Sequence, residues 1–317
     1  MEERKLVVSA APHIRAPETT SQLMLWVIIA LAPVTLAGLY VYKLLAVQTI
    51  AMSVIGAVGS EALMQKLLKK PITIYDGSAA LTGLLLALTL PPKLPWWLPL
   101  VGGITAVLLG KVVFGGLGHN IFNPALVSRA VLLLSWPQFL TKGSFKLIAV
   151  DTVTKATPLY IMKETRAGNL HAIASSFYKY LFLSNSSGAI GEISALMLII
   201  GGVILIWRRV IRWRIPITFL ATVAVFSLVL NADPLFYLLA GGLLLGAFFM
   251  ATDYVTSPIT PRGQIAFGIG CGFITVLLRF YSGLPEGVMF AILFMNSLAP
   301  LLDKYTQPRV FGTVKAQ

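Results

Sequence analysis

A polar stretch between two hydrophobic halves of the chain holds the residues best suited to chemistry by type and spacing. It reads Asp151-Thr152-Val153-Thr154-Lys155-Ala156-Thr157-Pro158-Leu159. A threonine hydroxyl can act as a nucleophile and carry a covalent group. Thr157 lies between the small Ala156 and Pro158. The alternative interpretation is an ordinary surface turn, because Ser and Thr favour loops through local hydrogen bonds.

The spacing Asp-x-x-(Ser/Thr)-x-Ala-Thr resembles the signal at which a flavin transferase esterifies the phosphate of FMN to a threonine hydroxyl. In this chain the matching positions are Asp151, Thr154, Ala156 and, as the acceptor, Thr157. So short a pattern with loosely fixed positions is a weak signal by itself. The resemblance implies a covalently attached FMN, and a flavin transferase as a partner during maturation.

A second polar group lies in the glycine-rich segment 110–129. Asn120 and Asn123, three residues apart, could present amide groups to one planar polar ligand. Asn123 also suits the cap of a helix that begins at Pro124. Arg129 falls inside a hydrophobic segment, where a charge is costly and normally faces a partner or a cavity. The alternatives are a plain helical hairpin and an arginine whose charge reaches the membrane surface.

Three carboxylates could help a sodium ion or a proton to pass. Asp253 lies at a predicted helix break, Asp303 ends the last hydrophobic segment, and Glu61 lies inside the second. Carboxylate oxygens are the ligands that hard cations prefer. The same side chains are equally suited to capping helices or meeting neighbouring subunits, so both roles stay open. We expect no further metal site.

The composition is that of an integral membrane protein. Hydrophobic residues make up 57% of the 317 positions and charged residues only 12%, whereas roughly a quarter of the residues of soluble domains are charged. The net charge of +13 is spread between long apolar runs, which indicates membrane orientation and argues against a nucleic-acid partner. The single cysteine, Cys271, excludes an internal disulfide and a self-contained iron–sulfur site.

Ten apolar segments reach or approach the length needed to cross about 30 Å of hydrocarbon. The longer ones are Leu23–Tyr42, Leu44–Leu63, Trp96–Phe114, Ile190–Trp207, Ile217–Leu230, Ile265–Tyr281 and Val288–Leu302, and the shorter ones are Ser78–Leu90, Asn123–Leu134 and Leu235–Met250. We therefore predict an all-α integral membrane protein with about ten transmembrane helices, several of them short or broken.

One long polar loop divides these segments into five and five. The predicted parts are an N-terminal segment (1–22), a first half (23–134), the loop with Thr157 (135–189), a second half (190–303) and a C-terminal tail (304–317). Thr82-Gly83-Leu84-Leu85-Leu86-Ala87 and Gly241-Gly242-Leu243-Leu244-Leu245-Gly246 echo one another weakly. Two five-helix halves must be inverted, and interrupted helices at matching places predict a site near the bilayer midplane. The alternative is that two Leu/Gly-rich helices look alike by composition.

The basic residues predict the orientation in a prokaryotic cell membrane. With both termini cytoplasmic, about fifteen lysines and arginines lie in inside segments, and three lie in short outside loops. The inside set is Arg4, Lys5, Arg15, Lys66, Lys69, Lys70, Lys111, Arg208, Arg209, Arg212, Arg214, Arg262, Lys304, Arg309 and Lys315, and the outside set is Lys43, Lys93 and Arg279. Because cytoplasmic loops carry the excess of positive charge, Thr157 is predicted to be extracytoplasmic. The N-terminal segment is polar and mixed in charge, so no cleavable signal peptide is expected.

The chain resembles, nearly end to end, the NqrB/RnfD family of membrane subunits of the Rnf and sodium-pumping NADH:quinone oxidoreductase complexes. The shared elements are Ser9–Arg15, Leu81-Thr82-Gly83, Gly110-Lys111 through Asn123-Pro124-Ala125, the motif Asp151–Thr157, Ala251-Thr252-Asp253 and Tyr305–Gly312. Lys155 departs from the family, which has a small residue there, whereas Thr157 and its two neighbours are intact.

The resemblance implies FMN on Thr157 and a noncovalent riboflavin near Asn120 and Asn123. It implies that electrons from reduced ferredoxin pass flavins at the outer membrane face and return to reduce NAD, coupled to export of Na⁺ or H⁺. The partners would be the other membrane, flavin and iron–sulfur subunits of an Rnf complex, together with membrane lipid, and the chain would not be active alone. From the residues themselves two rivals stay open: a non-redox transporter or channel with inverted repeats, and a structural membrane anchor.

Overall fold

The computed structural model describes residues 19–141, 178, 181–183, 188–282 and 287–307. Within these ranges the regular secondary structure is helical throughout, without a strand, which confirms the all-helical prediction. In the same part of the chain, four helices are long and apolar enough to cross a membrane. They are α1 (Thr20–Tyr42), α2 (Leu44–Leu67), α13 (Pro261–Tyr281) and α14 (Val288–Thr306).

Shorter apolar helices occupy the other predicted segments. They are α3 (Ser78–Thr89), α4 (Trp97–Val107) with its π-helical continuation η2 (Leu108–Val112), α5 (Pro124–Ser135), α9 (Ala195–Trp207) and α10 (Arg214–Val229). The brief elements are η1 (Ile74–Asp76), α6 (Pro137–Thr141), η4 (Ile190–Glu192), α11 (Pro234–Leu239), α12 (Leu243–Leu245) and the π-helical η5 (Gly246–Met250).

Two predicted segments differ from the observed helices. The segment Leu235–Met250 is divided into α11, α12 and η5, because the backbone turns at Gly241, whose φ of +71° belongs to the left-handed region that glycine tolerates. The segment Ile190–Trp207 begins as the single 3₁₀ turn η4, and its α-helix starts only at Ala195, where Ser194 caps the backbone N–H of Met197. The prediction of a short helix is thus confirmed for Leu235–Met250, whereas the helix in Ile190–Trp207, predicted among the longer segments, is shorter than expected.

Polar residues followed by proline start three of the helices. Asn123 caps α5, Asp233 caps α11 and Thr260 caps α13, and in each case proline occupies the first turn. The side-chain oxygen accepts hydrogen bonds from backbone N–H groups that have no partner within the helix, and proline has no N–H to satisfy. Local sequence thus determines where these three helices begin.

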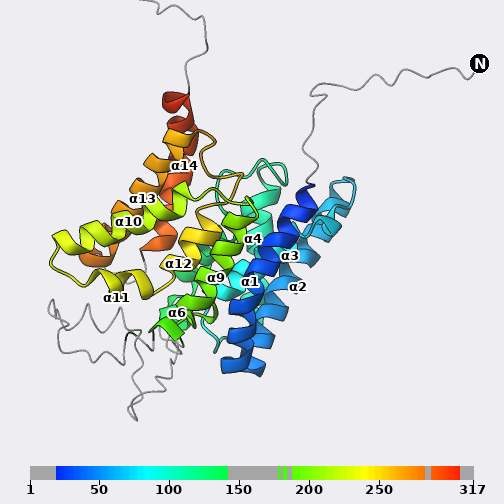
Figure 1. The fold of residues 1–317 in the computed structure, drawn as a ribbon. Helices are drawn as coiled ribbons and strands as arrows, with labels where there is room; N and C mark the ends of the chain where they lie inside the picture. Colours follow the sequence, from blue (N-terminus) through cyan, green and yellow to red (C-terminus); the bar gives the residue numbers. More distant parts are fainter. Residues whose placement is uncertain (1–18, 142–177, 179–180, 184–187, 283–286, 308–317) are drawn as a thin grey trace, which may run out of the picture.

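One close helix pair in residues 23–134 has a counterpart in residues 190–303. In the first half α2 lies along α4, and in the second α10 lies along α13. Glycine permits both contacts, since a Cβ at Gly103 would overlap the carbonyl of Ser53 and one at Gly268 would overlap the hydroxyl of Thr218. Between the halves α1 packs on α9, and α5 contacts α14. Figure 1 shows α2 and α3 at one side of the molecule, α10, α13 and α14 at the other, and α9 and α12 between them.

Large apolar side chains cover much of the outer surface of the helices. Leu36 on α1, Ile55 on α2 and Leu228 on α10 are each more than half exposed. Polar side chains lie inside instead, among them Ser53, Glu61 and Asn296. Apolar groups facing outward and polar groups facing inward suit helices that are surrounded by hydrocarbon.

Candidate functional site: a cavity between the two halves

A cavity lies where the two halves meet, with a volume of about 130 Å³. The first half contributes α1, α3, η2, the loop after η2 and the start of α5, and the second contributes the end of α9, the turn after α9, η5 and the loop that follows η5. The polar residues of its lining are Ser78, Thr82, Lys111, Asn120, Asn123, Thr252, Asp253 and Tyr254. Apolar side chains such as Leu85, Phe248 and Phe249 complete the wall, so the space is mainly apolar with a few polar groups.

Two π-helical turns lead into this lining. η2 carries Lys111 and η5 carries Phe248 and Phe249. After each turn the chain forms a loop that contributes further lining residues, and then enters a helix capped by a polar residue and proline. Turns of this type interrupt the regular helical hydrogen bonding and occur frequently at functional sites.

Asn120 and Asn123, predicted to act together, both line the cavity but make different contacts. Asn120 is buried, and its Nδ2 donates to the carbonyl of Phe122 at 3.3 Å. Its Oδ1 has no hydrogen-bond donor among the described residues. Asn123 uses its whole amide structurally: Oδ1 accepts from the N–H groups of Ala125 and Leu126, and Nδ2 donates to the carbonyl of Met250 at 3.2 Å. Of the two amides, Asn120 is therefore the freer to bind a ligand.

Asn123 also joins the halves through Asn296, a buried residue of α14. The backbone N–H of Asn123 donates to Asn296 Oδ1 at 3.3 Å, and Asn296 Nδ2 donates to the carbonyl of Thr256 at 3.1 Å. The hydroxyl of Thr256 in turn donates to Asp253 Oδ2 at 3.2 Å. One continuous polar chain thus runs from the cap of α5 to Asp253 in the other half.

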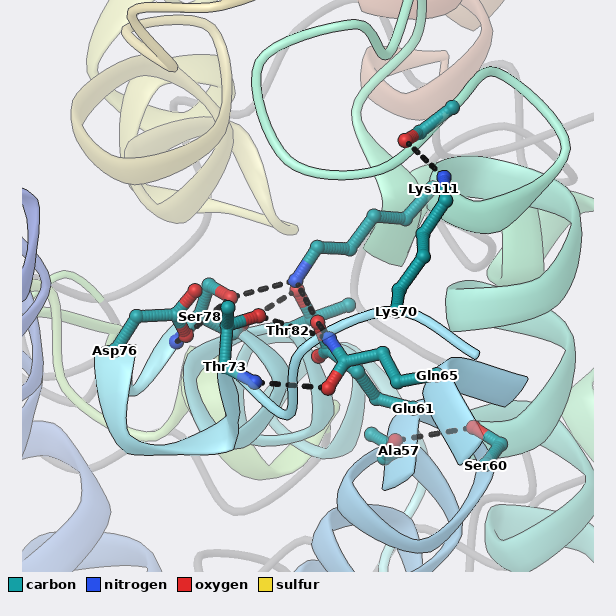
Figure 2. Close-up of polar contacts among 11 residues, drawn as sticks. Ala57, Ser60, Glu61, Gln65, Lys70, Thr73, Asp76, Ser78, Thr82 and Lys111 are labelled. Carbon is teal, nitrogen blue, oxygen red and sulfur yellow. Dashed lines mark hydrogen bonds and ion pairs between the residues drawn. The ribbon is translucent and has the colours of Figure 1, made fainter. Parts of the chain in front are cut away.

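Glu61, one of the three carboxylates predicted to help an ion pass, forms an ion pair with Lys111. Lys111 Nζ lies 2.6 Å from Glu61 Oε1 and donates to Ser78 Oγ at 2.6 Å. The side chains of Lys111 and Glu61 are 4% and 3% exposed, so the pair is shielded from water (Figure 2). Lys111 and Ser78 line the cavity whereas Glu61 lies behind them, and its Oε2 has no hydrogen-bond partner among the described residues. The ammonium therefore lies between the cavity and a buried carboxylate.

Neighbouring side chains hold this pair in place (Figure 2). Gln65 Nε2 donates to Glu61 Oε1 at 3.1 Å and to Thr73 Oγ1 at 2.8 Å. On the other side, Asp76 Oδ1 accepts from the N–H and the hydroxyl of Ser78. The start of α3 is thereby tied to α2 and η2, and the orientation of the lysine is fixed from both sides.

Asp253 lies in the loop between η5 and α13 and reaches the cavity wall. Burial raises the pKa of its carboxyl, because the charged form loses hydration. The N–H of Val255 and the hydroxyl of Thr256 donate to the carboxylate and oppose this rise. The carboxyl of Asp253 therefore faces the same space as Lys111 and Asn120.

The remaining predicted residues lie elsewhere. Asp303 Oδ1 accepts from the backbone N–H groups of Ile259 and Thr260, so it caps the approach to α13, which is the structural alternative predicted for it. Arg129 is half-buried on α5 and is not among the residues that line the cavity. The motif with Asp151, Thr154, Ala156 and Thr157 lies outside the described residues. Among the described residues no group of three or more His, Cys, Asp or Glu side chains could hold a metal ion.

Two residues of the site are not predicted from the sequence in these roles, Lys111 and Asn296. The charge distribution indicates only a cytoplasmic position for Lys111, although Leu109 and Val112 show that it interrupts an apolar run. A lysine and a glutamate in two hydrophobic segments are expected to pair, because a lone charge there is costly. That signal is present for Lys111 and Glu61. For Asn296 the sequence gives no indication of its partner 173 residues away.

Comparison with known proteins gives consistent matches over almost the entire chain. The profile of the NQR2, RnfD, RnfE family matches residues 7–312. The D subunit of the Na⁺-translocating ferredoxin:NAD⁺ oxidoreductase complex of Acetobacterium woodii is 48% identical, covering 99% of this chain and 98% of its own length. The D subunit of the proton-translocating ferredoxin:NAD⁺ oxidoreductase complex of Clostridium ljungdahlii is 44% identical, covering 96% of each. The D subunit of the ion-translocating oxidoreductase complex of Escherichia coli is 35% identical, covering 96% of this chain and 98% of its own length.

Proposed function

The chain belongs to the NQR2, RnfD, RnfE family, and we propose that it is a membrane subunit of an ion-translocating ferredoxin:NAD⁺ oxidoreductase complex. The similarity to the D subunits of such complexes extends over both chains and supports this assignment. As one subunit it works only with the membrane, flavin and iron–sulfur subunits that receive electrons from ferredoxin and reduce NAD⁺. Two relatives are named for different ions, sodium and protons, so either ion is compatible with the proposal.

The observation that carries the redox part of the proposal is the cavity between the halves. Its lining combines apolar side chains with the buried amide of Asn120, the ammonium of Lys111 and the carboxyl of Asp253. A flavin ring has an apolar body and a polar edge with donors and acceptors, and the polar groups of this lining are chemically complementary to that edge. The cavity of about 130 Å³ is smaller than the roughly 300–1,000 Å³ of typical ligand pockets. Binding of riboflavin would thus require lining side chains to move apart.

In this assignment the protein holds, orients and shields the flavin, which supplies the electron transfer when bound. Asn120 would contact the polar edge of the ring, and Asn123 would keep α5 joined to η5 so that both walls stay in register. Lys111 would place a positive charge at the cavity wall. The same ammonium contacts Glu61, which belongs to the proposed ion path. A change of charge in the cavity would therefore alter the electrostatic interaction between Lys111 and Glu61. Asp253 and Asp303 would complete that path.

The second flavin of the proposal is an FMN esterified to Thr157 by a flavin transferase. The motif Asp151–Thr157 supports it, with Thr154 and Ala156 at the matching positions. We further propose ten spans in two inverted five-helix halves, with both termini cytoplasmic and the loop of Thr157 outside. The matching packing of α2 on α4 and of α10 on α13 supports two related halves.

The cavity assignment is tested by counting noncovalent flavin. The Thr157→Ala variant, purified in mild detergent after expression with the other subunits, is precipitated with acid, and the released flavin is quantified. We expect about one riboflavin per chain in this variant, and a strong loss when Asn120→Leu is added. Asn231→Gly, a change in the turn after α10, is the control, because glycine tolerates the φ of +56° at that position. Equal flavin contents in both asparagine variants would rule out the cavity as the site.

A further inference from the structure

The turn that joins α9 to α10 concentrates arginine and tryptophan. Within eight residues it contains Trp207, Arg208, Arg209, Arg212, Trp213 and Arg214. Hereafter residues 207–214 are called the arginine turn. Arg208, Arg209 and Arg212 are exposed, and the indoles of Trp207 and Trp213 are 78% and 53% exposed. The turn therefore presents a dense positive charge and two large aromatic rings at the ends of two apolar helices.

The positive charge of the arginine turn is not neutralised within the described part of the chain. Among the described residues, the ion pair that forms joins Lys111 to Glu61. No carboxylate in this part of the chain forms an ion pair with an arginine of the turn. Arg212 instead donates weakly to the carbonyl of Ile259, at 3.4 Å. Groups that remain charged, exposed and without a counter-ion are available to an external anion.

Aromatic rings orient two of the guanidinium groups. That of Arg208 lies 3.9 Å from the ring centroid of Trp26 on α1, and that of Arg214 lies 5.8 Å from the ring centroid of Trp213. A guanidinium held on a ring face keeps its N–H groups free at the edge, where they can donate in pairs to phosphate oxygens.

The backbone of the turn changes direction at Arg209. Arg209 has φ of +58°, a left-handed conformation that normally favours glycine. Glycine would form the same turn with less strain. Lys43, Lys69 and Asn231 also have a positive φ, so this conformation fixes the direction of the chain at Arg209, and the proposal rests on the exposed charges and rings of the turn.

We propose that the arginine turn binds the phosphate headgroup of an anionic membrane phospholipid. The guanidinium groups of Arg208, Arg209 and Arg212 would hold the phosphate, and the two indoles would lie at the level of the headgroups. Exposed apolar side chains continue from the turn along both helices, Val203 on α9 and Ile217 on α10. They provide a surface for the acyl chains. The proposal requires only that the helices lie in a membrane, and it is independent of the flavins.

The opposite side of the same turn forms part of the cavity wall. Val210 and Ile211 line the cavity, and they lie between Arg209 and Arg212 in the sequence. The backbone N–H groups of Val210 and Ile211 both donate to the carbonyl of Leu205. A headgroup bound on the outside would therefore restrain the segment that closes the cavity on the inside.

The end of α2 provides a matched comparison. Lys66 and Lys69 are exposed there, and Lys69 also has a positive φ, of 52°. That end carries basic residues without a tryptophan. Removing two charges from α2 changes the net charge as much as removing two from the arginine turn, but it leaves the proposed site intact.

Native mass spectrometry of the purified full chain tests the proposal, with cardiolipin and phosphatidylglycerol as anionic probes and phosphatidylcholine as the zwitterionic one. We expect the wild type to retain the anionic lipids selectively. Arg209→Gln with Arg212→Gln should raise the dissociation constant about thirtyfold, since each basic residue near a membrane surface contributes on the order of 1 kcal/mol. Lys66→Gln with Lys69→Gln should leave it within about threefold.

Hydrogen exchange locates the contact. Added cardiolipin should slow amide exchange at residues 208–213 of the wild type and leave residues 66–70 unchanged. Equal weakening in both double variants would reveal general attraction to a positive protein and would overturn the proposal. Wild-type lipid affinity in the arginine variant, with loss of binding to the other subunits, would show instead that the turn is a protein contact.

Discussion

The ammonium of Lys111 lies 2.6 Å from the carboxylate of Glu61, and this pair connects the cavity wall to a buried position on α2. The two residues are fifty positions apart, on η2 and α2. Both are buried, and each makes the other tolerable in an apolar setting. The pair therefore has a structural effect that can be separated from its proposed part in ion movement.

Removing one member of this pair should destabilise the protein more than removing both. Lys111→Met leaves a buried carboxylate without a counter-ion, which costs about 3–5 kcal/mol. Adding Glu61→Met should recover most of that loss, because no charge then stays buried. Thermal unfolding in detergent, followed by tryptophan fluorescence, measures both effects. Additive losses in the double variant would show that the residues do not interact.

The two amides of the cavity should respond differently to substitution. Asn123→Ala removes the cap of α5, worth about 1 kcal/mol, together with the bond to the carbonyl of Met250. Asn123→Asp keeps the cap acceptor but loses the donor to Met250. We expect both variants to lose stability, with the larger loss for aspartate, because its carboxylate would be buried against the carbonyl of Met250 without a counter-ion, whereas Asn120→Ala should have little effect on unfolding. A stability loss at Asn120 equal to that of Asn123→Ala would contradict the division of roles.

The raised pKa of Asp253 predicts a dependence of stability on pH. In the unfolded chain the pKa of an aspartate is about 3.9, whereas in the folded protein burial raises the pKa of Asp253. Between these two pKa values the folded state binds more protons, so stability should decrease as pH rises through this interval. Asp253→Asn should remove that decrease. Melting temperatures across a pH series compare the variant with the wild type, and parallel curves would show that Asp253 does not cause the dependence.

The fold was predictable wherever hydrophobic length and helix-start signals agree. Asn123-Pro124 and Thr260-Pro261 begin helices because capping and proline act locally. The break at Gly241 could not be placed from composition, because an apolar run does not reveal where its backbone turns. The partnership of Asn123 with Asn296 depends on how α5 meets α14, and no local pattern encodes that contact. The sequence therefore predicts individual site residues. The contacts between them are seen only in the structure.

The predicted sidedness is testable with two single cysteines in a Cys271→Ser background. A cysteine replacing Asn169 should react with an impermeant thiol reagent added to intact cells. A cysteine replacing Gln317 should react only after the membrane has been opened, because the excess of basic residues keeps that side in the cytoplasm. The reverse labelling pattern would invert the proposed topology and place Thr157 in the cytoplasm.

The most direct test of the proposed redox role is the intact mass of the chain after expression with a flavin transferase. The wild type should gain the mass of one FMN less one water, and the band should show flavin fluorescence on a denaturing gel. Thr157→Ala should lack both signals yet remain in the membrane fraction, and Thr154→Ala, which keeps the acceptor hydroxyl, should show a reduced yield. An unmodified wild-type chain, or the same adduct in Thr157→Ala, would contradict the assignment.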